Sequence, residues 1–226
     1  MPVKPTLIAI ALAGCITETT HPVATVTAHW AIQALATGLP TGCPAGFEIA
    51  RLIAQPADGG APATTDLPCA AGLGESAALD AGVYAVSIAI VDAEGAVYAR
   101  SIPGAIDVSS GRDQRLDTTI LADAGYGQLA WTFVGATTGA ALDCDAGIDA
   151  IVVSATVGTT AYVDQLPCGP HAGLTRPLPA GGYTFFVTAS QLGQGIGTAI
   201  TASGQVIDDR NRITDLGSLQ IAIAGK

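Results

Sequence analysis

Residues of different polarity alternate with a period of two through several segments of this chain. Within residues 183–190, Tyr, Phe, Val and Ala alternate with a set that is mostly Thr and Ser. Within residues 84–90, Tyr, Val and Ile alternate with Ala and Ser. This period places each set on one face of a β-strand. Residues 92–95, Asp-Ala-Glu-Gly, predict a turn, and residues 96–102 predict the returning partner strand.

Short segments of this kind follow one another at intervals of about ten residues, each bounded by turn residues. This spacing predicts an antiparallel β-sandwich. The 28 Gly and 13 Pro residues also argue against a helical bundle. The predicted strands in the first part of the chain are 27–36, 47–55, 64–69, 74–79, 82–91, 96–108 and 114–121.

The chain contains one sequence module twice. Trp30 and Trp131 are 101 residues apart, as are Cys43 and Cys144. The later landmarks, Leu-Pro-Cys and Ala-Gly-x-Tyr, recur 99 residues apart, so two residues are deleted between the cysteines of the second copy. We therefore predict two domains, residues 24–121 and 128–225. The six residues between them are too few for a long flexible linker, so the domains should stand end to end with restricted freedom.

One segment is ambiguous when taken alone. Residues 29–36 are rich in Ala, Gln and Leu, which are good helix formers. Their counterpart, residues 130–137, contains Thr, Phe and Val, which favour strands. Because equivalent segments share a structure, the second copy predicts a strand for both.

Charge excludes one class of partner. Only 12% of the residues are charged, and 9 Lys and Arg stand against 19 Asp and Glu, for a net charge of −10. The basic residues are scattered, and only Arg112 with Arg115 and Arg210 with Arg212 come close together in the sequence. Phosphate binding needs clustered Lys and Arg, so nucleic acid is not an expected partner.

The first residues have the features of a targeting segment. Residues 1–4 carry one positive charge, and the apolar run 6–12 is too short to span a bilayer, which takes about 20 residues. This is the shape of a secretory signal peptide. The run ends in Leu-Ala-Gly-Cys at 12–15, which resembles the lipobox of bacterial lipoproteins. The resemblance implies that residues 1–14 are removed and that Cys15 carries fatty-acyl chains such as palmitate; the alternative is an ordinary signal peptide with a coincidental cysteine.

The lipoprotein resemblance also implies a location in the cell envelope. Ile16 stands where an Asp favours retention in the inner membrane, so the resemblance points to the outer membrane. We assign residues 15–23 to the lipidated cysteine and a tether. The polar, Pro-containing segment after Cys15 spans roughly 30 Å when extended, so the first domain should lie close to the membrane surface.

Each copy, at nearly 100 residues, has the size of an immunoglobulin-like domain. The copies also resemble tandem sandwich modules in envelope lipoproteins of predatory and social soil bacteria. The shared features are an early Trp, a Cys-x-Ala-Gly segment, a mid-domain Cys and an Ala-Gly-x-Tyr strand entry. The resemblance implies two tandem immunoglobulin-like sandwiches and no particular activity. Trp30 and Trp131 are then expected to anchor the cores, with a ligand-stacking platform as the alternative.

Four cysteines remain if Cys15 is lipidated, and four cysteines allow three pairings. The export of the protein places them in an oxidising compartment, where disulfides persist. The repeat selects the pairs Cys43–Cys69 and Cys144–Cys168, because each domain should close its own bridge. The rival interpretation is a metal site of four cysteines, but the paired spacing typical of zinc ligands is missing.

The sequence contains no recognised catalytic motif, so we predict neither an enzyme nor a cofactor. His21, His29 and His171 have no counterparts in the other copy. The segment Gly-Gln-Gly-Ile-Gly at 193–197 predicts a hairpin loop and not a dinucleotide site.

The acidic residues include one spacing found in some calcium loops. Asp143, Asp145 and Asp149 are candidate calcium ligands, to which Asp208 and Asp209 could add. The ordinary alternative is an acidic surface that keeps the protein soluble.

These observations favour a non-catalytic, lipid-anchored envelope protein that acts as a structural or adhesion scaffold. Its expected partners are the membrane, through the anchor, and an envelope protein or a glycan. The alternative is a polysaccharide-binding accessory module, and a hydrolase with an unrecognised site is a third candidate. A row of exposed aromatic rings among Tyr98, Tyr126, Tyr162 and Trp131 would favour glycan binding, whereas buried or scattered rings would favour a structural or protein-binding role.

Overall fold

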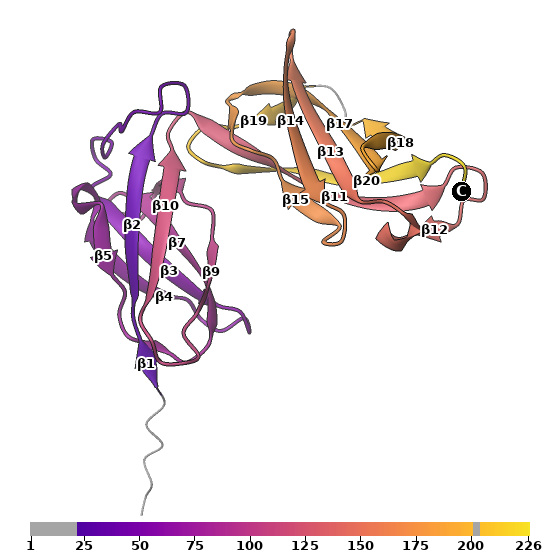
Figure 1. Cartoon of the computed structure of the whole chain (residues 1–226). Helices are drawn as coiled ribbons and strands as arrows, with labels where there is room; N and C mark the ends of the chain where they lie inside the picture. The colour runs from indigo at the N-terminus through magenta and orange to yellow at the C-terminus, as the bar shows by residue number, and fades with distance from the viewer. Residues whose placement is uncertain (1–21, 201–203) are drawn as a thin grey trace, which may run out of the picture.

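The computed structural model describes residues 22–200 and 204–226, and this part of the chain is almost entirely β (Figure 1). Its helical elements are two 3-10 turns, η1 (Cys69–Ala71) and η2 (Cys144–Ala146). The predicted signal peptide, Cys15 and His21 lie outside the described residues. Among the helices of the described residues, none has the length and apolar character needed to cross a membrane.

The first copy folds into two facing sheets and a small added pair of strands. One sheet has the order β10 (Gln114–Leu121), β2 (Val26–Gln33) and β5 (Leu73–Glu75). The facing sheet has the order β4 (Ala63–Pro68), β3 (Ile49–Pro56), β7 (Val83–Val91) and β8 (Val97–Arg100), and β9 (Gly104–Asp107) also pairs with β7. The added pair is β1 (Val23–Ala24) with β6 (Leu79–Asp80).

The second copy repeats this arrangement. Around β11 (Ala124–Gly135) lie β12 (Ala141–Leu142), β15 (Ala172–Leu174), β16 (Leu178–Pro179) and β20 (Ile213–Ile223). The facing sheet contains β14 (Thr160–Pro167), β13 (Ala150–Val157), β17 (Gly181–Gln191), β18 (Gln194–Ile200) and β19 (Gln205–Ile207). The strand β11 begins inside the segment 122–127 that the sequence predicted to be a connector.

Alternation along the strands builds two separate hydrophobic cores. In β2 the buried side chains occur at every second position and end in Trp30 and Ile32. One core gathers the buried apolar side chains of the first copy, and the other gathers those of the second, including Trp131 and Phe185. Burial of such surface is the main favourable contribution to folding, at roughly 25 cal/mol per Å². The predicted fold class, all-β with two tandem sandwiches, is confirmed.

The strand pairing differs from the prediction in one respect. The first and last long strands of each copy, β2 with β10 and β11 with β20, pair in parallel, whereas every other pairing among the described strands is antiparallel. The sheet that contains β3, β4, β7 and β8 also divides the strands differently from an immunoglobulin constant domain. Period-two patterning reports which face a residue occupies, but it does not report the direction of the neighbouring strand.

The predicted strand 96–108 is split into β8 and β9. The Ser101 hydroxyl accepts a hydrogen bond from the Ile88 amide at 2.9 Å, and the Ser101 amide donates to the Ile88 carbonyl at 2.8 Å. Pro103 follows and has no amide hydrogen for the ladder. The predicted strand 74–79 is likewise two shorter strands, β5 and β6.

Both Trp side chains anchor a core, as expected from the sequence. Trp30 and Trp131 are 6% and 1% exposed. Their indole nitrogens donate to the carbonyls of Cys69 at 3.0 Å and Cys168 at 3.3 Å, respectively. Each ring therefore connects the first long strand of its copy to the second cysteine, and neither ring is available as a ligand platform.

A tyrosine corner recurs at the start of β7 and β17. The Tyr84 hydroxyl donates to the Asp80 carbonyl at 3.0 Å, and the Tyr183 hydroxyl donates to the Pro179 carbonyl at 2.8 Å. In sandwich domains this hydrogen bond, from a Tyr hydroxyl to the backbone a few residues upstream, fixes the conformation of the chain where it enters a strand. The Ala-Gly-x-Tyr landmark of the sequence is this corner.

Each copy contains one disulfide, and the pairs are those that the repeat selects. Cys43 is bonded to Cys69 and Cys144 to Cys168, with Cα atoms 6.1 and 5.9 Å apart. All four sulfurs are therefore unavailable as thiolate ligands, which removes the metal site considered above. The closed loops span 26 and 24 residues.

Replacing both Cys43 and Cys69 by Ser should lower the free energy of unfolding of the first sandwich by about 3.5 kcal/mol, because the open loop has more entropy in the unfolded chain. Urea denaturation followed by Trp fluorescence measures this, since each copy holds one Trp. The Cys144→Ser and Cys168→Ser pair should produce its effect in the second sandwich only. An unchanged midpoint in both proteins would contradict the expectation.

Candidate functional site

The two sandwiches are joined through the side chain of one buried Asn. Asn211, in the loop between β19 and β20, is 2% exposed. Its Oδ1 accepts from the Leu121 amide at 2.9 Å and from the Tyr126 hydroxyl at 3.3 Å. Its Nδ2 donates to the Arg100 carbonyl at 2.8 Å, and its own amide donates to the Ala124 carbonyl at 2.7 Å. A residue of the second copy thus bonds to the first copy and to the connection between them.

The loop that carries Asn211 has an unusual backbone. Arg210 and Asn211 have φ angles of 60° and 58°, in the left-handed region that L side chains rarely adopt. Asn tolerates this region, but Arg does so at a cost of about 1–2 kcal/mol. The corresponding loop of the first copy, between β9 and β10, contains one residue with a left-handed backbone, Gly111, whose φ is 65°.

A groove of about 580 Å³ lies between this loop and β8, and residues of both copies line it. The Arg210 guanidinium carbon lies 4.9 Å from the centre of the Tyr98 ring, a cation–π contact. The Tyr98 ring also packs on Phe47, with centroids 5.3 Å apart. Arg100 and Arg212 line the same groove.

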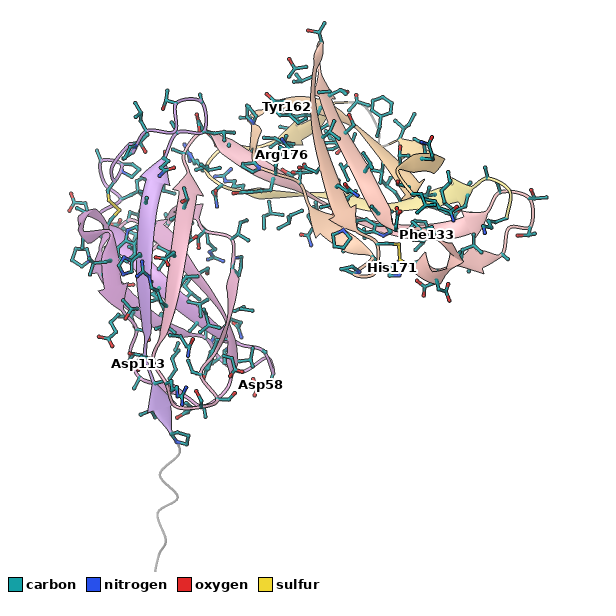
Figure 2. The ribbon with its side chains drawn as sticks, in the orientation of Figure 1. Asp58, Asp113, Phe133, Tyr162, His171 and Arg176 are labelled. Atoms are coloured by element: carbon teal, nitrogen blue, oxygen red, sulfur yellow. A yellow bond between two sulfur atoms is a disulfide. The ribbon has the colours of Figure 1, made fainter. Side chains whose placement is uncertain are left out.

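A second groove, of about 500 Å³, lies on another side of the junction. It is lined by Leu35 of the first copy and by Tyr162 and Arg176 of the second, which lie on the side of the second sandwich that faces the first (Figure 2). The Arg176 side chain is held by Asp164, with an Nε–Oδ1 distance of 2.7 Å. Because this guanidinium already has a carboxylate partner, we do not assign a ligand to this groove.

The four aromatic residues chosen from the sequence do not form a row. Trp131 is buried, and the other three are partly buried in different places, Tyr98 on β8, Tyr126 on β11 and Tyr162 on β14. Burial raises the pKa of Tyr126, whose hydroxyl bonds to Asn211. The arrangement favours structural roles for these rings over an aromatic platform for a glycan.

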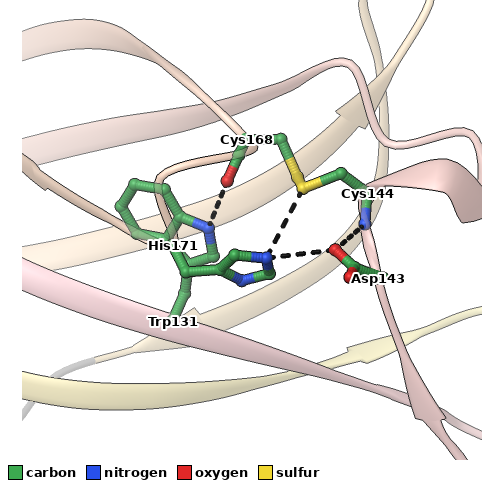
Figure 3. Close-up of polar contacts among 5 residues, drawn as sticks. All are labelled: Trp131, Asp143, Cys144, Cys168 and His171. Carbon is green, nitrogen blue, oxygen red and sulfur yellow. Dashed lines mark hydrogen bonds and ion pairs between the residues drawn. A yellow bond between two sulfur atoms is a disulfide. The ribbon is translucent and has the colours of Figure 1, made fainter.

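His171 forms a polar cluster beside the second disulfide (Figure 3). Its Nε2 lies 3.0 Å from Asp143 Oδ1 and 4.0 Å from Cys144 Sγ. Asp143 also accepts from the Cys144 amide at 2.6 Å. This amide, and then the His171 ring, hold the pKa of Asp143 below its ordinary value of 3.8. The cluster is not a metal centre, since the Cys144 sulfur is bonded to Cys168.

The first copy has glycines where the second copy has this pair. Gly42 corresponds to Asp143, and Gly72 corresponds to His171. His171 keeps the left-handed backbone of Gly72, with φ angles of 53° and 65°, and both carbonyls accept from the amide of the Trp in their copy. No short sequence motif marks this cluster, and the signal that locates it is the replacement of Gly42 and Gly72 by Asp143 and His171 in the second copy.

The three candidate calcium ligands are not brought together. Asp143 bonds to His171, and Asp149 accepts from the Leu192 amide at 2.6 Å. Among the described residues, the only cluster with metal-ligating atoms close enough together is the one that holds Asp143, Cys144 and His171. The carboxylates of Asp208 and Asp209 instead face Arg212 and Arg210, each at 3.7 Å.

No protein-family model matches the chain, and no curated protein matches its sequence. Several solved structures are similar in part. A leucine-rich repeat protein from Bacteroides thetaiotaomicron is 16% identical, with a TM-score of 0.43, over 90% of this chain and 27% of that chain. GBS52, the minor pilin of Streptococcus agalactiae, is 12% identical, with a TM-score of 0.32, over 90% of this chain and 97% of that chain.

A putative adhesin from Bacteroides ovatus is 11% identical, with a TM-score of 0.29, over 96% of this chain and 99% of that chain. This chain spans 27% of the leucine-rich repeat protein and 34% of the Bacillus anthracis TIE protein. With every TM-score below 0.5, none of these likenesses assigns a function to this chain.

Replacing Asn211 by Gly keeps the left-handed backbone accessible but removes the side chain at the junction. The buried Leu121 amide then loses its acceptor, which should cost about 1–3 kcal/mol of stability and let the sandwiches reorient independently. Small-angle X-ray scattering should show a broader distribution of particle dimensions. Asn211→Asp keeps the acceptor for the Leu121 amide but removes the donor to the Arg100 carbonyl, so it should loosen the junction as well; equal scattering from the Gly variant and the natural protein would contradict the role.

Replacing Asp143 by Asn should weaken the acid sensitivity of the second sandwich. Because the pKa of Asp143 is lowered in the folded protein, its stabilisation is present above the ordinary value of 3.8 and is lost as the pH falls through the folded-state value. The natural protein should therefore lose more stability than the variant between about pH 7 and about pH 3, as measured by urea midpoints. Asp145→Asn, the same charge change two residues away, is the control and should retain the natural pH dependence.

Proposed function

We propose that this chain is a non-catalytic cell-envelope protein that presents two sandwiches as a rigid binding scaffold for adhesion. Cys15 anchors it to a lipid layer, with the outer membrane as the destination. The observation that carries the proposal is the hydrogen-bonded junction between the two sandwiches, with Asn211 as its central contact. Each sandwich also has its own disulfide. The predicted limits of the two domains, 24–121 and 128–225, are part of the proposal.

The shape of the described chain supports display away from a surface. The strand β1 lies at one end of the molecule, and the C-terminus lies at the far end of the second sandwich (Figure 1). A tether that enters at β1 leaves the second sandwich as the outer one. Two acyl chains on Cys15 hold a protein stably at a membrane, whereas one chain does so only marginally.

The cluster at His171 contains no free thiol, because its one sulfur belongs to the second disulfide. A histidine beside a carboxylate can activate a nucleophile when one is free and within reach. The nearest candidate in that cluster, the Cys144 sulfur, is already bonded to Cys168. The pair therefore holds the loop against the disulfide.

Binding of a glycan is the second candidate, and the groove beside β8 is the observation that favours it. The aromatic rings do not form a stacking row, so a neutral polysaccharide lacks its usual platform here. The guanidinium groups of Arg210 and Arg212 instead provide donors for an anionic ligand.

Metabolic labelling with a radiolabelled fatty acid tests the anchor. The natural protein should carry label and fractionate with membranes, and Cys15→Ser should lose both properties. The Cys43→Ser and Cys69→Ser protein is the matched control and should keep the label. Cells that display the natural protein should also resist detachment under flow better than cells that make Cys15→Ser. Absence of label from the natural protein, or equal detachment of the two strains, would reject the proposal.

A further inference from the structure

The arginines of the groove beside β8 differ from three other arginines of this chain in their contacts with carboxylates. Arg51, Arg115 and Arg176 each make a close pair with a carboxylate, with N–O distances of 2.6 to 2.7 Å. In the groove, the shortest such distance is 3.7 Å, for Arg210 with Asp209 and for Arg212 with Asp208. A distance of 3.7 Å exceeds that of a hydrogen bond, so these guanidinium groups keep donors for another partner.

The geometry points to this groove as a binding site for a sugar acid, a carbohydrate unit with one carboxylate. Arg210 and Arg212 donate to the carboxylate, and Asp208 accepts from hydroxyl groups. This inference rests on the proposed binding function and names the ligand class.

Positive charge is concentrated in this groove, although the chain as a whole is negatively charged. The chain carries 9 basic residues and a net charge of −10, yet three of the nine line this groove. The charged residues that line the groove sum to +2, from three Arg and one Asp. Asp209, whose carboxylate lies 3.7 Å from Arg210 Nε, lowers the local charge to +1. Planar guanidinium groups match the geometry of a carboxylate through paired hydrogen bonds.

Arg210 is positioned before any ligand arrives. Its backbone is held in the left-handed region next to the buried Asn211, and its guanidinium rests on the Tyr98 ring. A side chain that is already ordered loses less entropy on binding, which raises affinity. The cost of the left-handed Arg is then offset by the binding that it allows.

The size and charge of the groove favour one sugar unit over a long polyanion or a phosphate. A volume of about 580 Å³ is in the range of small-molecule sites. The net charge of −10 repels an extended polyanion beyond the groove. Asp208, with its side chain 55% exposed, repels the second charge of a phosphate and accepts hydroxyl hydrogens that a sugar provides.

Isothermal titration calorimetry of the full chain in detergent tests the site, with galacturonic acid, galactose, inorganic phosphate and an acidic hexapeptide as probes. Galacturonic acid should bind, and galactose should show no heat because it lacks the carboxylate. Phosphate and the peptide should bind at least about tenfold more weakly than galacturonic acid.

Variants then locate the site. Arg212→Gln and Arg210→Gly should each weaken galacturonic acid binding by at least about tenfold. Glycine suits the left-handed backbone of residue 210, so this variant should fold. Arg115→Gln, outside the groove, is the matched control and should bind as the natural protein does.

Several results would overturn the assignment. They are the absence of heat with galacturonic acid at millimolar concentration, equal binding of galactose or phosphate, and unchanged affinity in Arg210→Gly. Fatty-acid labelling and detachment under flow do not depend on this groove. A failed titration with normal labelling and adhesion would therefore reject the ligand and leave the scaffold in place.

Discussion

The arrangement of the two sandwiches depends on hydrogen bonds made by one buried amide. A buried polar side chain is tolerated only when its donors and acceptors are paired, and Asn211 meets that condition by bonding to both sides of the junction. The bonds of its side chain reach residues 90 and 111 positions away in the sequence. Any rotation of one sandwich against the other therefore leaves a buried group unpaired, and this energetic penalty makes the junction stiff.

Within each copy, stability comes from different contacts. The Trp indole, the tyrosine corner and the disulfide all tie strands of one sandwich to one another, and each occurs once per copy. Each copy also has its own core, and the junction lies outside both cores. The junction determines orientation and builds a groove with contacts that are separate from those of the two cores. This separation lets one loop diverge while the framework stays constant.

The same separation explains what the sequence could predict. Alternating polarity located most strands, and the repeated Trp and Cys residues identified the duplication and its cysteine pairs, because these signals are local or recur at a fixed offset. The parallel pairing of β2 with β10 was not predictable from alternation, since a strand patterned for one buried face can run in either direction. The break at Ser101 depends on a hydroxyl that bonds to Ile88, which becomes visible only when the neighbouring strand is known.

The junction and the groove were harder to predict for a further reason. Arg210 and Arg212 are close in the sequence, but Arg100 joins them only because Asn211 brings β8 against the β19–β20 loop. Differences between the copies supply the missing signal. Gly72 and Gly111 adopt left-handed conformations freely, whereas His171 and Arg210 adopt them at a cost. A duplicated framework keeps the low-cost residue unless another interaction offsets that cost. His171 and Arg210 keep a left-handed backbone where the first copy has glycine, so interactions beyond the common fold should be sought there, and both residues border a polar cluster or groove.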